Sequence, residues 1–315
     1  MKAMIVPTRP SAPGRDTAMC HRVTVAVPVY NSEGTLPHTM ESILAQTYTN
    51  LEIVICDNAS TDRTTELCRE WAAKDPRVRY YRNQANIGQT RNFRKALELS
   101  SGEFFMWTCA DDCRPPEAIE RLVEALVSNP KAVMAHGPII ARGIDFEVEI
   151  ANAMDLSSPS PAERVRSFIR GIRHNSMVHG LYRRASLKKL VFGAHYGQDY
   201  LFSLQVCVMG PVQHVPQAMI VYHEKGVRPS EPMPRRPITL LEFLKSRGTN
   251  RKCLTVLLTG SRYVLTCREV ALSQRVATAL AYLSTFGAMY RRRLVMDAVS
   301  TFLRPLFGPR PWPGS

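Results

Sequence analysis

The chain has 315 residues, enough for one large domain or two smaller ones with a buried core. Hydrophobic residues make up 45% and charged residues 22%, which excludes a disordered or fibrous chain and fits a folded soluble protein. The net charge of +14 is unusual, and most of it lies in residues 234–315, where 14 Lys and Arg against three acidic residues leave +11. This basic tail is either a solvated helical face or a surface for an anionic partner.

The two ends of the chain lack the usual export and membrane signals. Residues 1–20 contain three prolines and no apolar core of signal-peptide type, so we expect a mobile leader. The longest uncharged apolar stretch near the other end, 276–290, has 15 residues, fewer than the roughly 20 that cross a bilayer. The eight cysteines form no C-x-x-C pair, which argues against a zinc cage or a disulfide framework. These patterns favour a cytoplasmic protein with reduced thiols.

Short apolar runs alternate with helical patterns through residues 21–142. VTVAVPV (23–29) and LEIVIC (51–56) are typical of buried parallel strands. The alternation predicts an open, mostly parallel sheet with helices on both faces. Beyond residue 143 the pattern weakens. We expect further strands at 78–81, 103–108, 132–135, 178–182 and 215–222, and helices at 35–46, 63–74, 88–99, 115–128, 199–209 and from 238 onward.

Polar pairs follow the ends of three predicted strands: Tyr30-Asn31, Asp57-Asn58 and Asp111-Asp112. Because ligands bind at the carboxyl ends of parallel strands, these pairs should meet at one edge of the sheet. Carboxylates there could hold a divalent cation that bridges phosphate oxygens, although an isolated Asp-Asp pair is more often a solvated turn. Asp57 could accept a hydrogen bond from a nucleobase while the Tyr30 ring stacks on that base. The sequence fits equally well with Asp57 capping a turn and the Tyr30 ring filling a gap in the packing.

Five short motifs occur in an order that resembles one enzyme family. They are VAVPVYN (25–31), CDNASTD (56–62), NIGQTRN (86–92), GEFFMWTCADD (102–112) and GQDY (197–200). Together they resemble the family 2 glycosyltransferases of the GT-A fold over about residues 21–223. The resemblance implies an α/β protein with a Rossmann-like, mostly parallel sheet. It also implies that the chain transfers a sugar from a nucleotide-diphosphate sugar to an acceptor hydroxyl, with inversion.

The resemblance assigns roles to individual residues. Asp112 matches the metal ligand of the family's Asp-x-Asp signature, for Mn²⁺ or Mg²⁺, and Asp199 matches the catalytic base. His223 is a further candidate for the metal or the diphosphate, with a buried structural histidine as the alternative. The donor-binding candidates are Pro28, Tyr30, Asn31, Asp57, Asn58, Asn86, Gly88, Arg91 and Asp111.

The chain departs from the family pattern at a few positions. Asn58 stands where a second Asp is common, Ala110 leaves no acid two places before Asp112, and Gln198 precedes Asp199 where Glu is commoner. A nucleotidyltransferase usually has a Gly-rich phosphate loop and a dinucleotide oxidoreductase has G-x-G-x-x-G, and neither follows residues 23–29. An inactive relative that serves as a basic membrane- or partner-binding module is the remaining alternative.

The expected organisation has four parts. After the leader of residues 1–20, residues 21–142 form the nucleotide-sugar half and 143–233 the acceptor half, which would take a glycan, glycolipid or small-molecule acceptor. Residues 234–315 form a basic helical extension. Apolar residues around Arg291-Arg292-Arg293 indicate an amphipathic helix suited to an anionic membrane, at the inner face of the cytoplasmic membrane. A core-packing helix with exposed arginines is the alternative, and no nucleic acid is expected as partner.

Overall fold

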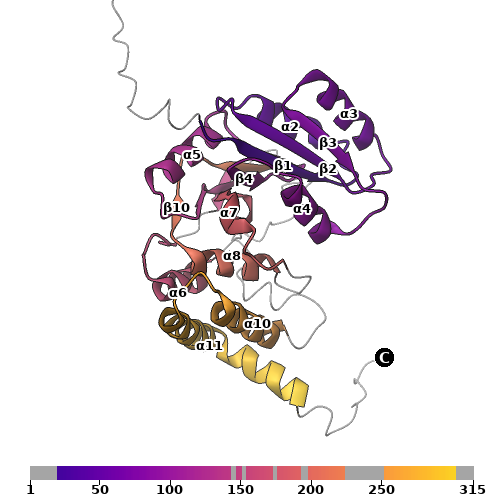
Figure 1. Ribbon diagram of the computed structural model, residues 1–315. Helices are drawn as coiled ribbons and strands as arrows, with labels where there is room; N and C mark the ends of the chain where they lie inside the picture. The colour runs from indigo at the N-terminus through magenta and orange to yellow at the C-terminus, as the bar shows by residue number, and fades with distance from the viewer. Residues whose placement is uncertain are drawn as a thin grey trace, which may run out of the picture.

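The computed structural model describes residues 20–142, 147–150, 154–172, 176–192, 198–223 and 252–302. The predicted leader, apart from residue 20, lies outside these ranges. A twisted sheet with its helices forms one end of the molecule, and a stack of helices from later in the chain lies beside one of its faces (Figure 1). The expected α/β class is confirmed.

Seven strands form the central sheet, in the order β10-β6-β9-β4-β1-β2-β3. β1 (Val23–Val29), β2 (Leu51–Asp57), β3 (Val78–Arg82) and β4 (Phe104–Trp107) run parallel, as predicted. β1 and β2 are buried along their whole length, which explains their unbroken apolar sequences. The carboxyl ends of these four strands form one edge of the sheet.

The other strands of the central sheet, and the strands expected late in the chain, differ in part from the predicted ones. β6 (Met134–His136) does not pair with β4, because β9 (Leu181–Arg183) lies between them and is antiparallel to both. The predicted strand at 178–182 begins in the short 3₁₀ helix η1 (Ser176–His179), and only its second part is a strand, β9. Only the end of the predicted strand at 215–222 is a strand, β11 (Ile220–His223), and the strand before it, β10 (Val212–His214), ends ahead of residue 215. Pro216, which has no N–H to donate, lies in the turn between them.

A second sheet of four short strands has the order β5-β11-β7-β8. β5 (Asp112–Cys113) pairs antiparallel with β11, so that Tyr222 lies opposite Asp112. β7 (Ile139–Arg142) pairs with β11 and with β8 (Glu147–Ile150). This sheet fixes the backbone of the Asp-Asp pair.

Helices cover both faces of the central sheet because side chains alternate along each strand. Val23, Val25 and Val27 pack with one set of helices, whereas Ala26 and Trp107 pack with the other. The first set is α2 (Leu36–Leu44), α3 (Thr64–Lys74) and α5 (Ala118–Ser128); the second is α4 (Gln89–Glu98), α6 (Pro161–Gly171) and α8 (Gln198–Met209). The four-residue helix α7 (Arg184–Leu187) follows β9.

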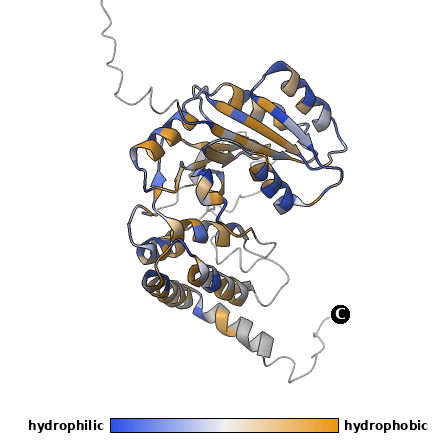
Figure 2. Ribbon diagram, viewed as in Figure 1, coloured by the Kyte–Doolittle hydropathy of each residue, from blue (hydrophilic) through white to orange (hydrophobic). Residues whose placement is uncertain are grey.

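The described part of the basic extension, residues 252–302, forms α10 (Lys252–Thr266) and α11 (Leu272–Phe302), which pack together and against α6 and α8 (Figure 1). Tyr282, Phe286 and Tyr290 of α11 are buried, and the Phe286 ring meets the Tyr200 ring of α8 at 6.4 Å between centroids. Apolar residues also lie on other parts of the α10 and α11 ribbons (Figure 2). Among the described helices, none is both long and apolar enough to cross a membrane.

Candidate active site

The loops that follow β1 and β2 are bound to each other at the edge of the sheet. The backbone N–H of Asn58 donates to the carbonyl of Val29 at 2.9 Å, and the N–H of Thr61 donates to Asn31 Oδ1 at 2.8 Å. Asn31 has φ of 48° and Ala59 has φ of 63°, backbone conformations that residues other than glycine seldom adopt outside specialised turns. The strands thus bring Tyr30-Asn31 and Asp57-Asn58 together, with the Tyr30 ring 47% exposed and Pro28 buried inside β1.

Asp57 is completely buried and serves as a hydrogen-bond acceptor for the loop. Its carboxylate accepts from the Ser60 N–H and hydroxyl at 2.8 and 2.6 Å, from Thr65 at 2.9 Å and from Tyr80 at 2.8 Å. Burial alone would raise the pKa of Asp57, but these hydrogen bonds outweigh it and lower the pKa. In this structure Asp57 therefore shapes the 58–62 loop from within.

Four asparagines connect the end of β2 to the start of α4. Asn58 donates to Asn86 Oδ1 at 2.8 Å and accepts from the Ile87 N–H at 2.9 Å, while Asn92 donates to the Cys56 carbonyl at 2.8 Å. Asn83 donates to both Asn58 and Asn92, at 3.2 and 2.9 Å. The network fixes the turn that precedes the helix.

Gly88 is the N-cap of α4, with φ of 84°. A side chain there would meet no atom within 4 Å, so the backbone conformation, and not a lack of space, favours glycine. Helix N-termini carry free N–H groups that suit phosphate oxygens. Arg91, in the first turn of α4, is exposed and offers a cation on the same helix.

The Asp111-Asp112 pair follows β4, whose last residue Trp107 pairs with Ala26 of β1. The pair therefore lies at the same edge of the sheet as the other two predicted pairs. Asp112 is only 4% exposed, and its Oδ2 lies 3.3 Å from Nδ1 of His179. Cys109, Asp112 and His179 each offer one ligand atom, and these three atoms all lie within 4.8 Å of one another. Of these three residues, only Asp112 is a site residue predicted from the sequence.

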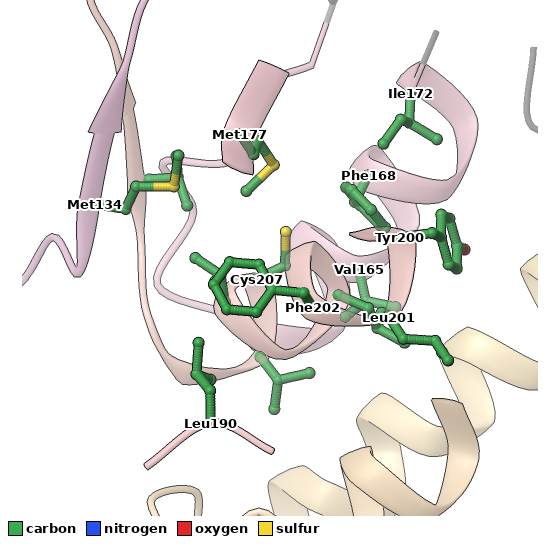
Figure 3. Packing of buried hydrophobic residues seen from close by; sticks show 14 of the residues in the cluster. Met134, Val165, Phe168, Ile172, Met177, Leu190, Tyr200, Leu201, Phe202 and Cys207 are labelled. Carbon is green, nitrogen blue, oxygen red and sulfur yellow. The ribbon is translucent and has the colours of Figure 1, made fainter. Parts of the chain in front are cut away.

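His179 is held in place by its neighbours on both sides. The buried Arg114 guanidinium donates to the His179 carbonyl at 2.6 Å. Met177 of η1 points toward Cys207 and Phe202 of α8, which anchors the short helix in the core (Figure 3). Burial, aided by Arg114, lowers the pKa of His179 to about 4, so the imidazole is neutral at physiological pH. A neutral imidazole can act as a ligand.

Asp199 lies in the first turn of α8, and α8 contacts η1. Asp199 as a whole residue is exposed, but its carboxyl is largely buried. This burial raises the pKa of Asp199, and His179 opposes the rise. Asp111 and Asp199 both act electrostatically on His179 and on Cys109. Burial and the neighbouring carboxylates raise the pKa of the Cys109 thiol well above its usual value. Asp199 thus belongs to the same group of charges as the Asp-Asp pair.

Sequence reasoning missed Cys109, Arg114 and His179. Cys109 was read only as one of eight unpatterned cysteines, and His179 falls in a segment predicted as a strand. His223 is the terminal residue of β11, next to Tyr222, the residue that pairs with Asp112. The His223 side chain lies outside the described part of the structure, so its role stays a prediction.

Comparison with known proteins gives the class of this site. The family model described as "Glycosyl transferase family 2" matches residues 24–191. A relative named "Uncharacterized glycosyltransferase" from Haemophilus influenzae is 28% identical over 219 residues, covering 66% of this chain and 67% of the relative. The chain spans smaller shares, 15% and 38%, of two further glycosyltransferases that it matches.

Solved structures support the same fold. S. aureus TarS 1-349 in complex with UDP-GlcNAc has a TM-score of 0.59 and 15% identity, covering 90% of this chain and 76% of TarS. The mannosyltransferase PcManGT of Pyrobaculum calidifontis, in complex with GDP-Man and Mn²⁺, has a TM-score of 0.50 and 17% identity, covering 92% and 76%.

The fold and the matched region define a glycosyltransferase with a GT-A-type α/β architecture. More particularly, the chain belongs to glycosyltransferase family 2. The resemblance inferred from the five motifs is confirmed.

Proposed function

We propose that this glycosyltransferase moves a sugar from a nucleoside diphosphate onto an acceptor hydroxyl, in a single displacement that inverts the anomeric carbon. The observation that carries this proposal is the grouping of Asp112, His179 and Asp199 beside the carboxyl ends of β1, β2 and β4. Family membership supports it, as do the nucleotide sugars bound by the two solved neighbours, UDP-GlcNAc in TarS and GDP-Man in PcManGT.

The donor would lie across the ends of β1 and β2. Tyr30 offers an exposed ring for the base, and Asn31, Asp57 and Asn58 shape the loops beneath it. Beside them, the N-terminus of α4 at Gly88, with Arg91, offers N–H groups and a cation for the diphosphate. Asn86 accepts from the Gly88 N–H at 2.9 Å and so orients this turn.

Asp112 is the residue that would hold a divalent cation. The structure offers a fitting donor set, because an imidazole nitrogen and a thiol sulfur lie near its carboxylate. When bound, a divalent cation neutralises the charge that develops on the departing diphosphate. Asp111, on the same loop, would support the donor, and His223 remains a candidate for either role.

Asp199 would act as the general base. Asp199 is partly exposed as a residue, and burial of its carboxyl raises its pKa, so that beside the charged cluster it can accept the acceptor's hydroxyl proton as the new bond forms. His179 lowers the pKa of Asp199, but burial of the carboxyl outweighs this effect. Asp199 therefore keeps the raised affinity for a proton that a base requires.

The acceptor would be a glycan or glycolipid, reached at a membrane surface. Eight of the ten exposed large hydrophobic side chains in the described part of the chain lie on α10 and α11. On α11, Leu272, Val276, Leu280 and Leu283 follow helical spacing along one exposed face, which we call the tail face. Arginines at 262, 275 and 291 are on the same two helices, and Arg268 lies in the turn between them. Apolar and basic groups together suit an anionic bilayer surface.

One experiment tests the transferase proposal directly. Purified protein is incubated with a panel of UDP-, GDP- and dTDP-sugars, with and without Mn²⁺, and its melting temperature is measured. We expect one donor class to raise the melting temperature in a Mn²⁺-dependent way, because a ligand that binds the folded state stabilises it. The anomeric configuration of a product made from that donor then decides between inversion and retention. A retained configuration contradicts the single displacement.

A further inference from the structure

The cluster of Cys109, Asp112 and His179 contains a sulfur and a nitrogen donor where an all-oxygen site would suit Mg²⁺. We propose that Cys109 and His179 are metal ligands together with Asp112, and that the site prefers a borderline transition cation such as Zn²⁺ or Co²⁺ over Mg²⁺. This inference rests on the proposed function in placing a cation at Asp112. It adds two ligands and a metal preference that the carboxylate pair alone would not give.

The distance between the nitrogen and the oxygen fits a shared cation. Two ligand atoms bound to a tetrahedral metal at about 2.0–2.1 Å lie about 3.3–3.4 Å from each other. His179 Nδ1 and Asp112 Oδ2 are 3.3 Å apart. Nδ1 is buried and has no hydrogen bond of acceptable geometry, even though the carboxylate oxygen is so near. The two atoms are thus spaced as ligands of one cation.

Three separate parts of the fold hold the ligands in place before any metal arrives. Asp112 is fixed by the pairing of β5 with β11, and Cys109 by the short loop after β4. His179 ends η1, and Gly180 follows it where a Cβ would come within 2.2 Å of Met134 Cε, so the chain turns closely against the core. Such support is what a specific metal site requires.

The chemistry of the donors determines the metal preference. Binding of a cation would release the proton of the Cys109 thiol, and the resulting thiolate is a soft ligand. Imidazole is an intermediate ligand, and both favour Zn²⁺ and Co²⁺, whereas Mg²⁺ takes oxygen ligands and retains water. The buried Arg114 cation also lies near Asp112, and it repels a cation at this site. A hard cation would be bound here by oxygen ligands alone, and their binding energy would offset less of this repulsion. A cation that also binds sulfur and nitrogen has more binding energy to offset it.

Cobalt spectroscopy on the full chain tests the ligand set without measuring transfer. Metal-free protein is titrated with Co²⁺, with the near-ultraviolet sulfur-to-cobalt band and the visible ligand-field bands recorded. We expect both bands in the wild type, and an excess of Mg²⁺ should not remove them. Cys109→Ser should lose the sulfur band and keep weaker visible bands, and His179→Gln should weaken Co²⁺ binding at least about tenfold.

The chain offers two matched controls. Cys113→Ser removes a thiol four residues away that contacts the His38 carbonyl, and His38→Gln removes an exposed histidine outside the cluster. Both variants should keep the wild-type spectrum, and circular dichroism should show all four variants folded. Cobalt binding without a sulfur band in the wild type, or a band that survives Cys109→Ser, overturns the proposal.

Failure of this inference is distinguishable from failure of the proposed function. If Co²⁺ binds without a sulfur band and Mn²⁺ still supports donor binding, the ligand set is wrong and the transferase proposal stands. If the sulfur band is present but no donor in the panel is bound or transferred, the ligand set is right and the proposed function fails.

Discussion

The Nδ1 atom of His179 lies 3.3 Å from Oδ2 of Asp112. This contact joins the start of β5 to the short helix η1, which precedes the inserted antiparallel strand β9. Asp199, at the start of α8, acts electrostatically on the same histidine. One imidazole thus connects the predicted metal ligand with the predicted base, and substitutions at the two carboxylates should have different effects.

Replacing Asp199 with Asn should abolish catalysis but leave donor binding intact. The amide cannot accept the acceptor's proton, so kcat should fall by roughly 10²–10⁴-fold, the usual contribution of a general base. The donor should still raise the melting temperature as it does in the wild type. Asp155→Asn, at an exposed aspartate of the surface, is the matched control and should retain full activity. An active Asp199→Asn enzyme would contradict the base assignment.

The same assignment predicts the acid limb of the pH–rate profile. The pKa of Asp199 is raised from the ordinary value of 3.8, and only the ionised carboxylate can act as base. Activity should therefore fall as the pH is lowered through the raised pKa, at a pH above 3.8. Residual activity of Asp199→Asn should lack this limb. The measurement is kcat against pH at saturating donor and acceptor.

Replacing Asp112 with Asn should instead remove the metal dependence of donor binding. The neutral amide is a much weaker ligand, so the Mn²⁺-dependent part of the donor's thermal stabilisation should disappear, and kcat should fall by at least about 10²-fold. Asp111→Asn should retain metal dependence with weaker donor binding. Calorimetric titration of the donor with and without Mn²⁺ makes the comparison, and unchanged Mn²⁺ dependence in Asp112→Asn would contradict its role as ligand.

Glu52 should control the acid stability of the fold. This fully buried carboxylate accepts from Thr24 at 2.5 Å, from the Ser101 N–H and hydroxyl at 2.8 and 2.9 Å, and from Arg79. Burial would raise the pKa of Glu52, but these hydrogen bonds together outweigh burial and lower it from 4.5 to about 2. Because the folded-state pKa is depressed, this stabilisation is complete above pH 4.5 and is lost as the pH falls toward about 2.

Urea unfolding at a series of pH values measures this effect. Wild type should lose on the order of 1–3 kcal/mol of unfolding free energy across that interval in excess of Glu52→Gln. At neutral pH the Gln variant should already be less stable, since its amide cannot accept all the hydrogen bonds that the carboxylate accepts. Parallel pH curves for the two proteins would contradict the assignment.

The sequence predicts β1 to β4 well, because these strands are apolar and alternate with clear helical patterns. β1 and β2 are continuous buried runs, and their polar ends meet as the parallel topology requires. β9 could not be predicted in the same way, because it has three residues and its position depends on pairing with β4 and β6. The place of His179 follows from that pairing, so no local pattern around residue 179 indicates a site.

The helices of the basic extension show why an amphipathic sequence pattern does not decide which apolar residues are exposed. The apolar residues that the sequence pattern assigns to an amphipathic membrane helix, with core packing as the alternative, include Leu280, Leu283, Phe286 and Met289. The structure divides them: Phe286 is fully buried against the core, whereas Leu280, Leu283 and Met289 are 62%, 41% and 43% exposed. Periodicity identifies apolar positions, but the packing of α6 and α8 decides which of them remain at the surface.

That exposed set leads to a prediction about membrane binding. Replacing Val276 and Leu280 of the tail face with Glu should weaken binding to vesicles that contain phosphatidylglycerol. Each buried aliphatic side chain contributes about 1.5–3 kcal/mol to partitioning, and each 1.4 kcal/mol is about a tenfold change in affinity. The new charges would also be repelled by anionic lipid. Flotation should therefore fall by at least about tenfold.

Control variants and control lipids distinguish membrane binding by the tail face from binding of another partner. Val191→Glu, at an exposed valine outside α10 and α11, should bind vesicles like the wild type. Wild type should bind neutral phosphatidylcholine vesicles more weakly, and added salt should weaken binding to the anionic ones, because the arginines contribute through screened charge. If the double variant instead changes a dimer into a monomer in light scattering and vesicle binding is unaffected, the tail face joins two copies of this chain and the membrane proposal is wrong.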